Sequence, residues 1–195
     1  MHFILDNNFS QKEREKILIK YTENFYKTKE KEIKNGLRNV VKEWGKVENT
    51  NFKIIDKVFK KHSWPKGNYF GIVSIFWMYP RYISKKTFFF PYRHRIINYA
   101  NRVISHEMLH FIFFDYIKKR YDLDEGAEFK NKHPEYLWRV SEVFNNIIEN
   151  WEPYKKVSQA KSLPYNGTEK MFKKMKNQWQ KKQDIDELLD KWLKI

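Results

Sequence analysis

The chain has 195 residues, with 39 Lys and Arg against 24 Asp and Glu, so its formal net charge is +15 at pH 7. It contains no Cys, which excludes disulfide scaffolds, thiol nucleophiles and thiolate-bound metals. Any metal must therefore be held by His and carboxylate side chains. No apolar run approaches the ~20 residues that span a bilayer, so we expect no membrane segment.

The positive charge is compatible with nucleic-acid binding and equally with a Lys-rich, solvated surface. Basic residues are spread along the chain, with short runs at Lys60-Lys61 and at 118–120 and a longer one between Lys170 and Lys182. This spread favours the solvated surface over a nucleic-acid partner. The start, Met1 to Asp6, lacks the basic and apolar regions of a signal peptide, so we expect a cytoplasmic protein.

The N-terminal part, from about residue 10 to 47, carries apolar residues at helical spacing. Asn8 or Ser10 is suited to cap the first helix, and Gly36 and Gly45 indicate breaks that divide the region into more than one helix. A short apolar stretch that follows, at 52–59, fits a helix or a strand.

Two strand-like runs, 69–78 and 81–90, are rich in β-branched and aromatic residues and predict a small antiparallel sheet. A long helical pattern then runs from about Tyr92 or His94 to Arg120.

After a polar connection over 122–132, His133-Pro134 opens a further helix that runs to about Asn150, and 168–195 is predicted to be helical in two pieces. The order predicts an α+β fold with a catalytic domain over residues 1–152, N-terminal helices included. Residues 153–195 then form a C-terminal helical segment.

The segment from His106 through Glu107 to His110 is an HEXXH motif within the long predicted helix. Residues four apart lie on the same helix face, so both imidazoles can bind one Zn²⁺ ion, which prefers tetrahedral coordination. Glu107 is offset by one position, so it can hydrogen-bond a metal-bound water and act as its general base. The sequence therefore predicts a zinc-dependent hydrolase.

The third ligand cannot be a third His of the extended motif, because Phe113 and Tyr116 stand where that class has Gly and His. Glu142 is the preferred candidate, since it lies between apolar residues on a predicted buried helix face and requires a partner there.

Asn146, one turn further along the same predicted helix, could accept a hydrogen bond from the second nitrogen of a ligand His. Glu125 and Glu128, in the acidic connection, are the competing third ligands.

An HEXXH motif followed some thirty residues later by a Glu on its own helix resembles the gluzincin clan of metallopeptidases. The order of N-terminal helices, small sheet, motif helix and Glu helix is most similar to the minigluzincins, which are compact soluble peptidases. The resemblance rests on His106, Glu107, His110 and Glu142, and Asn146 departs from the Asp that the family often has. It implies zinc as cofactor and a peptide or protein as substrate.

The resemblance also implies that such a protein can be latent, with residues of about 155–195 restraining access to the metal. A packed helical appendage is the alternative for this segment. His133, Tyr136, Tyr154 and Tyr165 are all candidates for stabilising the oxyanion of a tetrahedral intermediate, and the sequence does not choose among them.

Two other functions remain open. One is a basic nucleic-acid-associated protein with a structural or degenerate zinc site, which would bind polyanions in a salt-sensitive way and cleave no peptide. The other is a zincin-like hydrolase that acts on something other than a peptide.

Overall fold

A computed structural model describes residues 9–96, 98–159 and 161–193 of the chain, so the expectation for Met1 to Asp6 lies outside the described residues. The chain forms two compact units, Met1–Asn39 and Val40–Ile195. Helices and a small sheet make up the described elements, which confirms the predicted α+β class. In chain order these elements are α1 (Gln11–Val58), β1 (Phe70–Ser74), β2 (Arg81–Tyr82), β3 (Thr87–Pro91), α2 (Tyr99–Tyr121), α3 (Tyr136–Glu149), the 3-10 helix η1 (Glu152–Lys156), α4 (Glu169–Lys181) and α5 (Ile185–Leu193).

A single helix of 48 residues, α1, occupies the N-terminal region where the sequence predicted several. Ser10 caps it in a reciprocal arrangement, because its backbone N–H donates to Glu13 at 2.8 Å and its hydroxyl accepts from the Glu13 N–H at 3.4 Å. The breaks expected at Gly36 and Gly45 are absent from this described helix. A helical Gly costs only about 1 kcal/mol relative to Ala, which is too little to end a helix by itself.

The sheet has the strand order β1-β3-β2 and is mixed, where the sequence predicted a purely antiparallel one. β1 runs parallel to β3, and β2 runs antiparallel to it. The Ser74 hydroxyl donates to the carbonyls of Phe76 and Met78 at 3.0 and 3.3 Å, which turns the chain out of the sheet just after β1. The chain therefore re-enters the sheet at β2, on the far side of β3 from β1.

The two site-bearing helices begin later than the sequence predicted. α2 starts at Tyr99 because Asn98 adopts the left-handed conformation, with φ 60°, which a helix cannot continue through. α3 starts at Tyr136, two residues beyond Pro134, and ends at Glu149, close to the predicted end at Asn150. The C-terminal region forms two helices, α4 and α5, as predicted.

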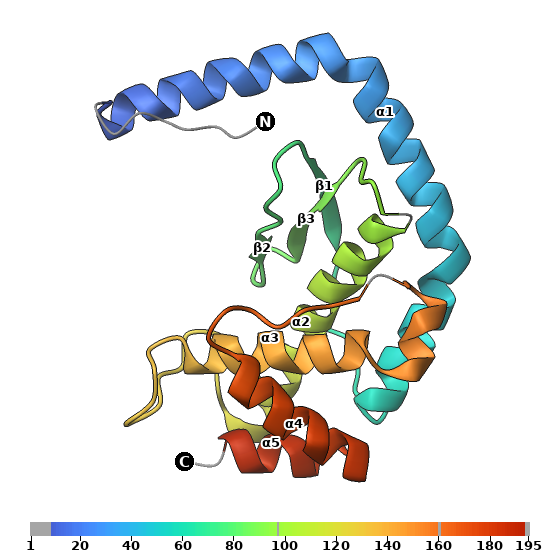
Figure 1. Ribbon diagram of the computed structural model, residues 1–195, viewed down its shortest axis with the longest axis vertical. Coiled ribbons are helices and arrows are strands. Elements are labelled where there is room, and N and C mark those ends of the chain that lie inside the picture. The colour runs from blue at the N-terminus through green and yellow to red at the C-terminus, as the bar shows by residue number, and fades with distance from the viewer. Residues whose placement is uncertain (1–8, 97, 160, 194–195) are drawn as a thin grey trace. The chain divides into compact units, whose positions relative to one another are not determined.

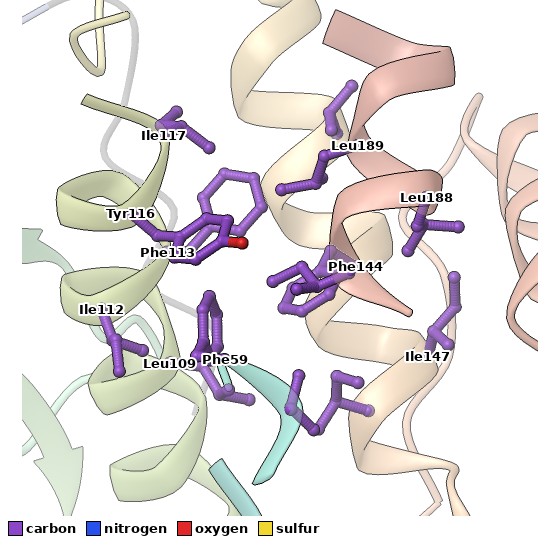
Figure 2. Packing of buried hydrophobic residues seen from close by; sticks show 14 of the residues in the cluster. Phe59, Leu109, Ile112, Phe113, Tyr116, Ile117, Phe144, Ile147, Leu188 and Leu189 are labelled. Carbon is purple, nitrogen blue, oxygen red and sulfur yellow. The ribbon is translucent and has the colours of Figure 1, made fainter. Parts of the chain in front are cut away.

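Within the second unit, α2 lies between the sheet on one side and α3 on the other, and α4 packs on α3 (Figure 1). One apolar cluster joins Phe88 and Phe90 of β3 to the sheet-facing side of α2. A larger cluster joins α2 to the end of α1, α3, α4 and α5, and Figure 2 shows side chains of α2, among them Phe113, directed toward Phe144 of α3 and Leu189 of α5. Because α2 is covered from both sides, its polar side chains must find hydrogen-bond or ion-pair partners inside the protein. Among the described helices, none has both the length and the apolar character needed to cross a bilayer.

Candidate metal centre

The structure brings His106 and His110 of α2 together with Glu142 of α3, so that one ligand atom from each lies within 4.8 Å of the others. The two His side chains share a face of α2 because they are four residues apart. Glu142 faces them from the middle of α3, where its side chain is 3% exposed. The group could hold a metal ion, and its three members are those that the sequence predicted as ligands.

The separations within this group suit tetrahedral coordination. The two imidazole Nε2 atoms are 3.1 Å apart, Glu142 Oε2 lies 3.2 Å from His106 Nε2, and Glu142 Oε1 lies 3.3 Å from His110 Nε2. Two ligand atoms bound to one zinc ion at about 2.0–2.1 Å in a tetrahedral site lie about 3.3–3.4 Å from each other. The closest approaches of the three side chains are within a few tenths of an ångström of this spacing, with a different Glu142 oxygen facing each imidazole.

Glu149 orients the His106 ring through a contact with Nδ1, the ring nitrogen that faces away from the other two ligand groups. Its Oε1 lies 2.8 Å from His106 Nδ1, and its side chain is 2% exposed. The prediction that Asn146 would fill this role is wrong, because its amide donates instead to the Ser162 hydroxyl at 2.9 Å. A carboxylate behind a ligand His fixes the tautomer that leaves Nε2 free for a metal.

The ionisable side chains of this group shift one another's pKa values. Burial alone lowers the pKa of His106, but the carboxylates of Glu149 and Glu142 outweigh it and raise that pKa well above its usual value. Burial, together with nearby Arg81, lowers the pKa of His110 to about 3, so this imidazole is neutral. Burial alone raises the pKa of Glu142, but the two imidazoles outweigh it and hold that pKa far below its usual range. The pocket thus favours a cation at the point between the two rings and Glu142.

Glu107 lies beside this group and is 5% exposed. Burial raises its pKa to about 7, against the opposing influence of His106 and Arg81. Its Oε2 atom is buried and has no hydrogen-bond partner among the described residues. A carboxylate whose pKa is close to neutral pH, and which has an oxygen that forms no hydrogen bond, is suited to accept and return a proton.

Arg81, at the start of edge strand β2, contacts both acids of the centre, and sequence reasoning missed it. Its Nη1 lies 3.4 Å from Glu142 Oε1 and 4.0 Å from Glu107 Oε2, and its side chain is 12% exposed. Its guanidinium also reaches Glu125 Oε1 at 3.6 Å, so the structure places that competing ligand against Arg81 and outside the three-residue group. Glu128, the other competitor, is likewise outside the group.

A cleft of about 610 Å³ opens onto the centre, with both His106 and Glu107 in its lining. Tyr165 lines the same cleft and is half-exposed. Burial, aided by the surrounding carboxylates, raises the pKa of Tyr165 to about 12, so its phenol stays a proton donor. Five large apolar side chains of the cleft lining are exposed to solvent: Trp77, Met78, Ile96, Leu163 and Tyr165.

Of the predicted oxyanion-stabilising candidates, the other three lie outside this cleft. The Tyr136 hydroxyl donates to the Trp192 carbonyl at 2.9 Å, and Tyr154 is completely buried. His133 is exposed and accepts the Glu135 backbone N–H at its Nδ1.

The donor set fits a metal ion: two imidazoles and a carboxylate close together, a second carboxylate behind one imidazole, and alongside them a buried carboxylate oxygen of Glu107 that forms no hydrogen bond among the described residues. No protein-family model, curated protein or solved structure matches this chain. The fold and the site therefore define an α+β protein with a His-His-Glu group, buried except for His106 at the cleft, that could hold a metal ion.

Proposed function

We propose that the chain is a zinc-dependent peptidase whose centre comprises His106, His110 and Glu142 as metal ligands and Glu107 as the proton acceptor. The observation that carries the proposal is the position of Glu107. Its buried carboxylate, with a pKa of about 7, stands next to a tetrahedrally spaced His-His-Glu group at the base of an open cleft. A general base works best when its pKa is close to the pH of the reaction.

The ion, when bound, supplies a Lewis acid that makes water acidic near pH 7 and polarises a carbonyl oxygen. Glu107 then takes the proton that the attacking water loses and returns it to the leaving amine. Glu149 holds the His106 ring in the orientation that ligation requires, through its 2.8 Å contact with Nδ1. Tyr165, a protonated phenol on the cleft wall, is the described side chain best suited to donate a hydrogen bond to the developing oxyanion.

The substrate backbone would lie along the edge of the sheet that ends at β2. This edge carries Arg81, which contacts the acids of the centre, and the preceding residues Trp77 to Tyr79 line the cleft. An extended peptide can pair with an open strand edge through its main chain, which fixes the position of the scissile bond. The edge position of β2, and the contacts of its Arg81 with Glu107 and Glu142, support a peptide as the substrate.

Access to this cleft would be restrained by the segment that follows η1. The Asn150 amide donates a hydrogen bond to the Ser162 carbonyl at 2.8 Å, and the Arg102 guanidinium donates one to the Lys161 carbonyl at 3.0 Å. Leu163 and Tyr165, just beyond these anchors, line the cleft. The proposal therefore includes partial latency, in which this segment limits the entry of substrate into the cleft.

Three variants test the catalytic assignment: Glu107→Gln, Glu142→Ala and, as a matched control, Glu125→Gln. Bound zinc is measured by elemental analysis and cleavage by mass spectrometry of a mixed peptide library. We expect Glu107→Gln to keep zinc and lose cleavage, Glu142→Ala to lose both, and the control to keep both. Cleavage retained by Glu107→Gln overturns the mechanism, and full zinc occupancy in Glu142→Ala overturns the ligand assignment.

The latency is tested with a point variant rather than a truncation. α4 and α5 contribute Met175, Trp179 and Leu188 to the main core, so deleting these helices would expose the core. Asn150→Ala releases the anchor on the segment, and Asn177→Ala on the exposed side of α4 is the control. Higher kcat/KM in Asn150→Ala alone is the expected result. Equal kcat/KM in both variants contradicts the latency.

A further inference from the structure

A second cleft, of about 580 Å³, lies between α4, α5 and the start of α3, away from the metal centre. Its lining is dominated by Lys side chains and contains a single carboxylate, that of Glu187, which is paired with Lys182. The five lysines of the lining are Lys132, Lys174, Lys181, Lys182 and Lys191.

The other two acids of α5, Asp186 and Asp190, bond with residues outside the cleft lining and do not neutralise its lysines. Asp186 bonds with Lys60 and accepts the Tyr116 hydroxyl, and Asp190 accepts the Tyr121 hydroxyl at 2.8 Å. Lys60 lies in the turn just after α1, and Tyr116 and Tyr121 belong to α2. Two of the three acids of α5 are therefore bound away from the cleft, and only Glu187 of this helix lies in its lining.

The three central lysines, Lys174, Lys181 and Lys191, are exposed and have no acidic partner within 4 Å among the described residues. Such a concentration of uncompensated positive charge raises the local concentration of anions. Together with Lys132, these three ammonium groups exceed what a single phosphate needs, which indicates a ligand with repeated negative charges.

The walls that carry these lysines are fixed. The Trp192 indole donates to Gln178 Oε1 at 2.6 Å, and the Tyr136 hydroxyl donates to the Trp192 carbonyl at 2.9 Å, so α5 is joined to both α4 and α3. Met175 and Leu189 anchor the two helices in the main core. The ammonium groups therefore project from a preformed groove, which lowers the ordering cost of binding.

We propose that this cleft binds the phosphate backbone of a single-stranded nucleic acid. The apolar residues of α4 and α5 are committed to the core, so the helices offer no apolar face for insertion into a lipid surface. Part-exposed Trp192, in the lining beside the lysines, offers a ring on which a base can stack, as is usual in grooves for single strands. The proposal does not depend on the metal centre.

The test uses the full chain with EDTA and measures fluorescence anisotropy of labelled single-stranded DNA and RNA oligonucleotides over a range of salt concentrations. The cleft variant is Lys174→Gln with Lys181→Gln and Lys191→Gln. The control removes equal charge from exposed positions elsewhere in the second unit, by Lys42→Gln, Lys53→Gln and Lys156→Gln. Circular dichroism confirms that both variants are folded.

Each phosphate contact contributes about 0.7 to the slope of log K against log salt for single strands, so the cleft variant should lower the slope by about two and weaken binding about 100-fold at 0.1 M salt. The control should change binding far less. Equal weakening in both variants shows that bulk charge alone is responsible and overturns the site. Absence of salt-dependent binding by the unmodified chain overturns it as well, as does tighter, equally Lys-dependent binding to anionic phospholipid vesicles.

Discussion

Glu149 offers the most direct test of how the centre is organised, because it touches the ligand His106 without belonging to the ligand group. Its carboxylate is 2% exposed and lies 2.8 Å from His106 Nδ1. Glu149→Ala leaves that ring nitrogen without its acceptor and frees the imidazole to rotate. Glu149→Gln keeps an acceptor oxygen but removes the charge that favours Nδ1 protonation.

Loss of a buried partner behind a metal-bound His typically weakens metal affinity about 10–100-fold, or about 1.4–2.7 kcal/mol. Since the contact is short and shielded from water, we expect Glu149→Ala to weaken zinc affinity by an amount at the upper end of this range. Glu149→Gln should weaken it by an amount at the lower end. Zinc affinity is measured by competition with a chromogenic chelator at pH 7, with exposed Glu152→Gln as the control. Affinities within twofold of the unmodified chain for both Glu149 variants would refute the role assigned to this residue.

Three further predictions concern stability. Phe144→Ala removes a fully buried ring from the main core and should cost about 3–5 kcal/mol in urea unfolding; a loss under about 1 kcal/mol would contradict the packing described. Asp186→Asn should destabilise at neutral pH. Burial alone raises the pKa of Asp186, but the hydrogen bonds from Lys60 and Tyr116 and the charges of Lys60 and Arg120 together outweigh it and lower the folded-state pKa. The resulting stabilisation is lost as the pH falls through that lowered pKa, so an equal cost at pH 7 and at about pH 2 would contradict it. Gly71→Ala places a Cβ 2.9 Å from the Phe90 ring and should cost about 1–3 kcal/mol in the same assay, whereas an unchanged free energy of unfolding would show that the ring moves freely.

Helical periodicity made part of the centre readable from the sequence. The His106–His110 spacing implies a shared helix face wherever the helix forms, and an acid among apolar neighbours, such as Glu142, requires a buried partner. Glu149 was readable by the same rule. At about 100° per residue, seven positions return to within about 20° of Glu142, whereas the four positions to Asn146 leave an offset of about 40°.

Other features depend on contacts distant in sequence. Nothing local to Arg81 indicates that it lies against Glu142, 61 positions further along the chain, because that contact arises from the order of the strands. The parallel pairing of β1 with β3 likewise joins segments that are distant in sequence, and the Ser74 hydroxyl bonds to the turn where β1 ends. Alternation of apolar residues identifies strands but does not choose their neighbours.

The centre joins two helices of the core, since two of its ligand groups belong to α2 and the third to α3. An ion held there would act as a cross-link between these helices and stabilise the folded chain over the unfolded one. At a hundredfold excess over Kd this linkage is worth about 2.7 kcal/mol, and a chain of this size gains about 2–4 °C in Tm for each kcal/mol. The melting temperature therefore reports which metal ion the protein selects, before any substrate has been found.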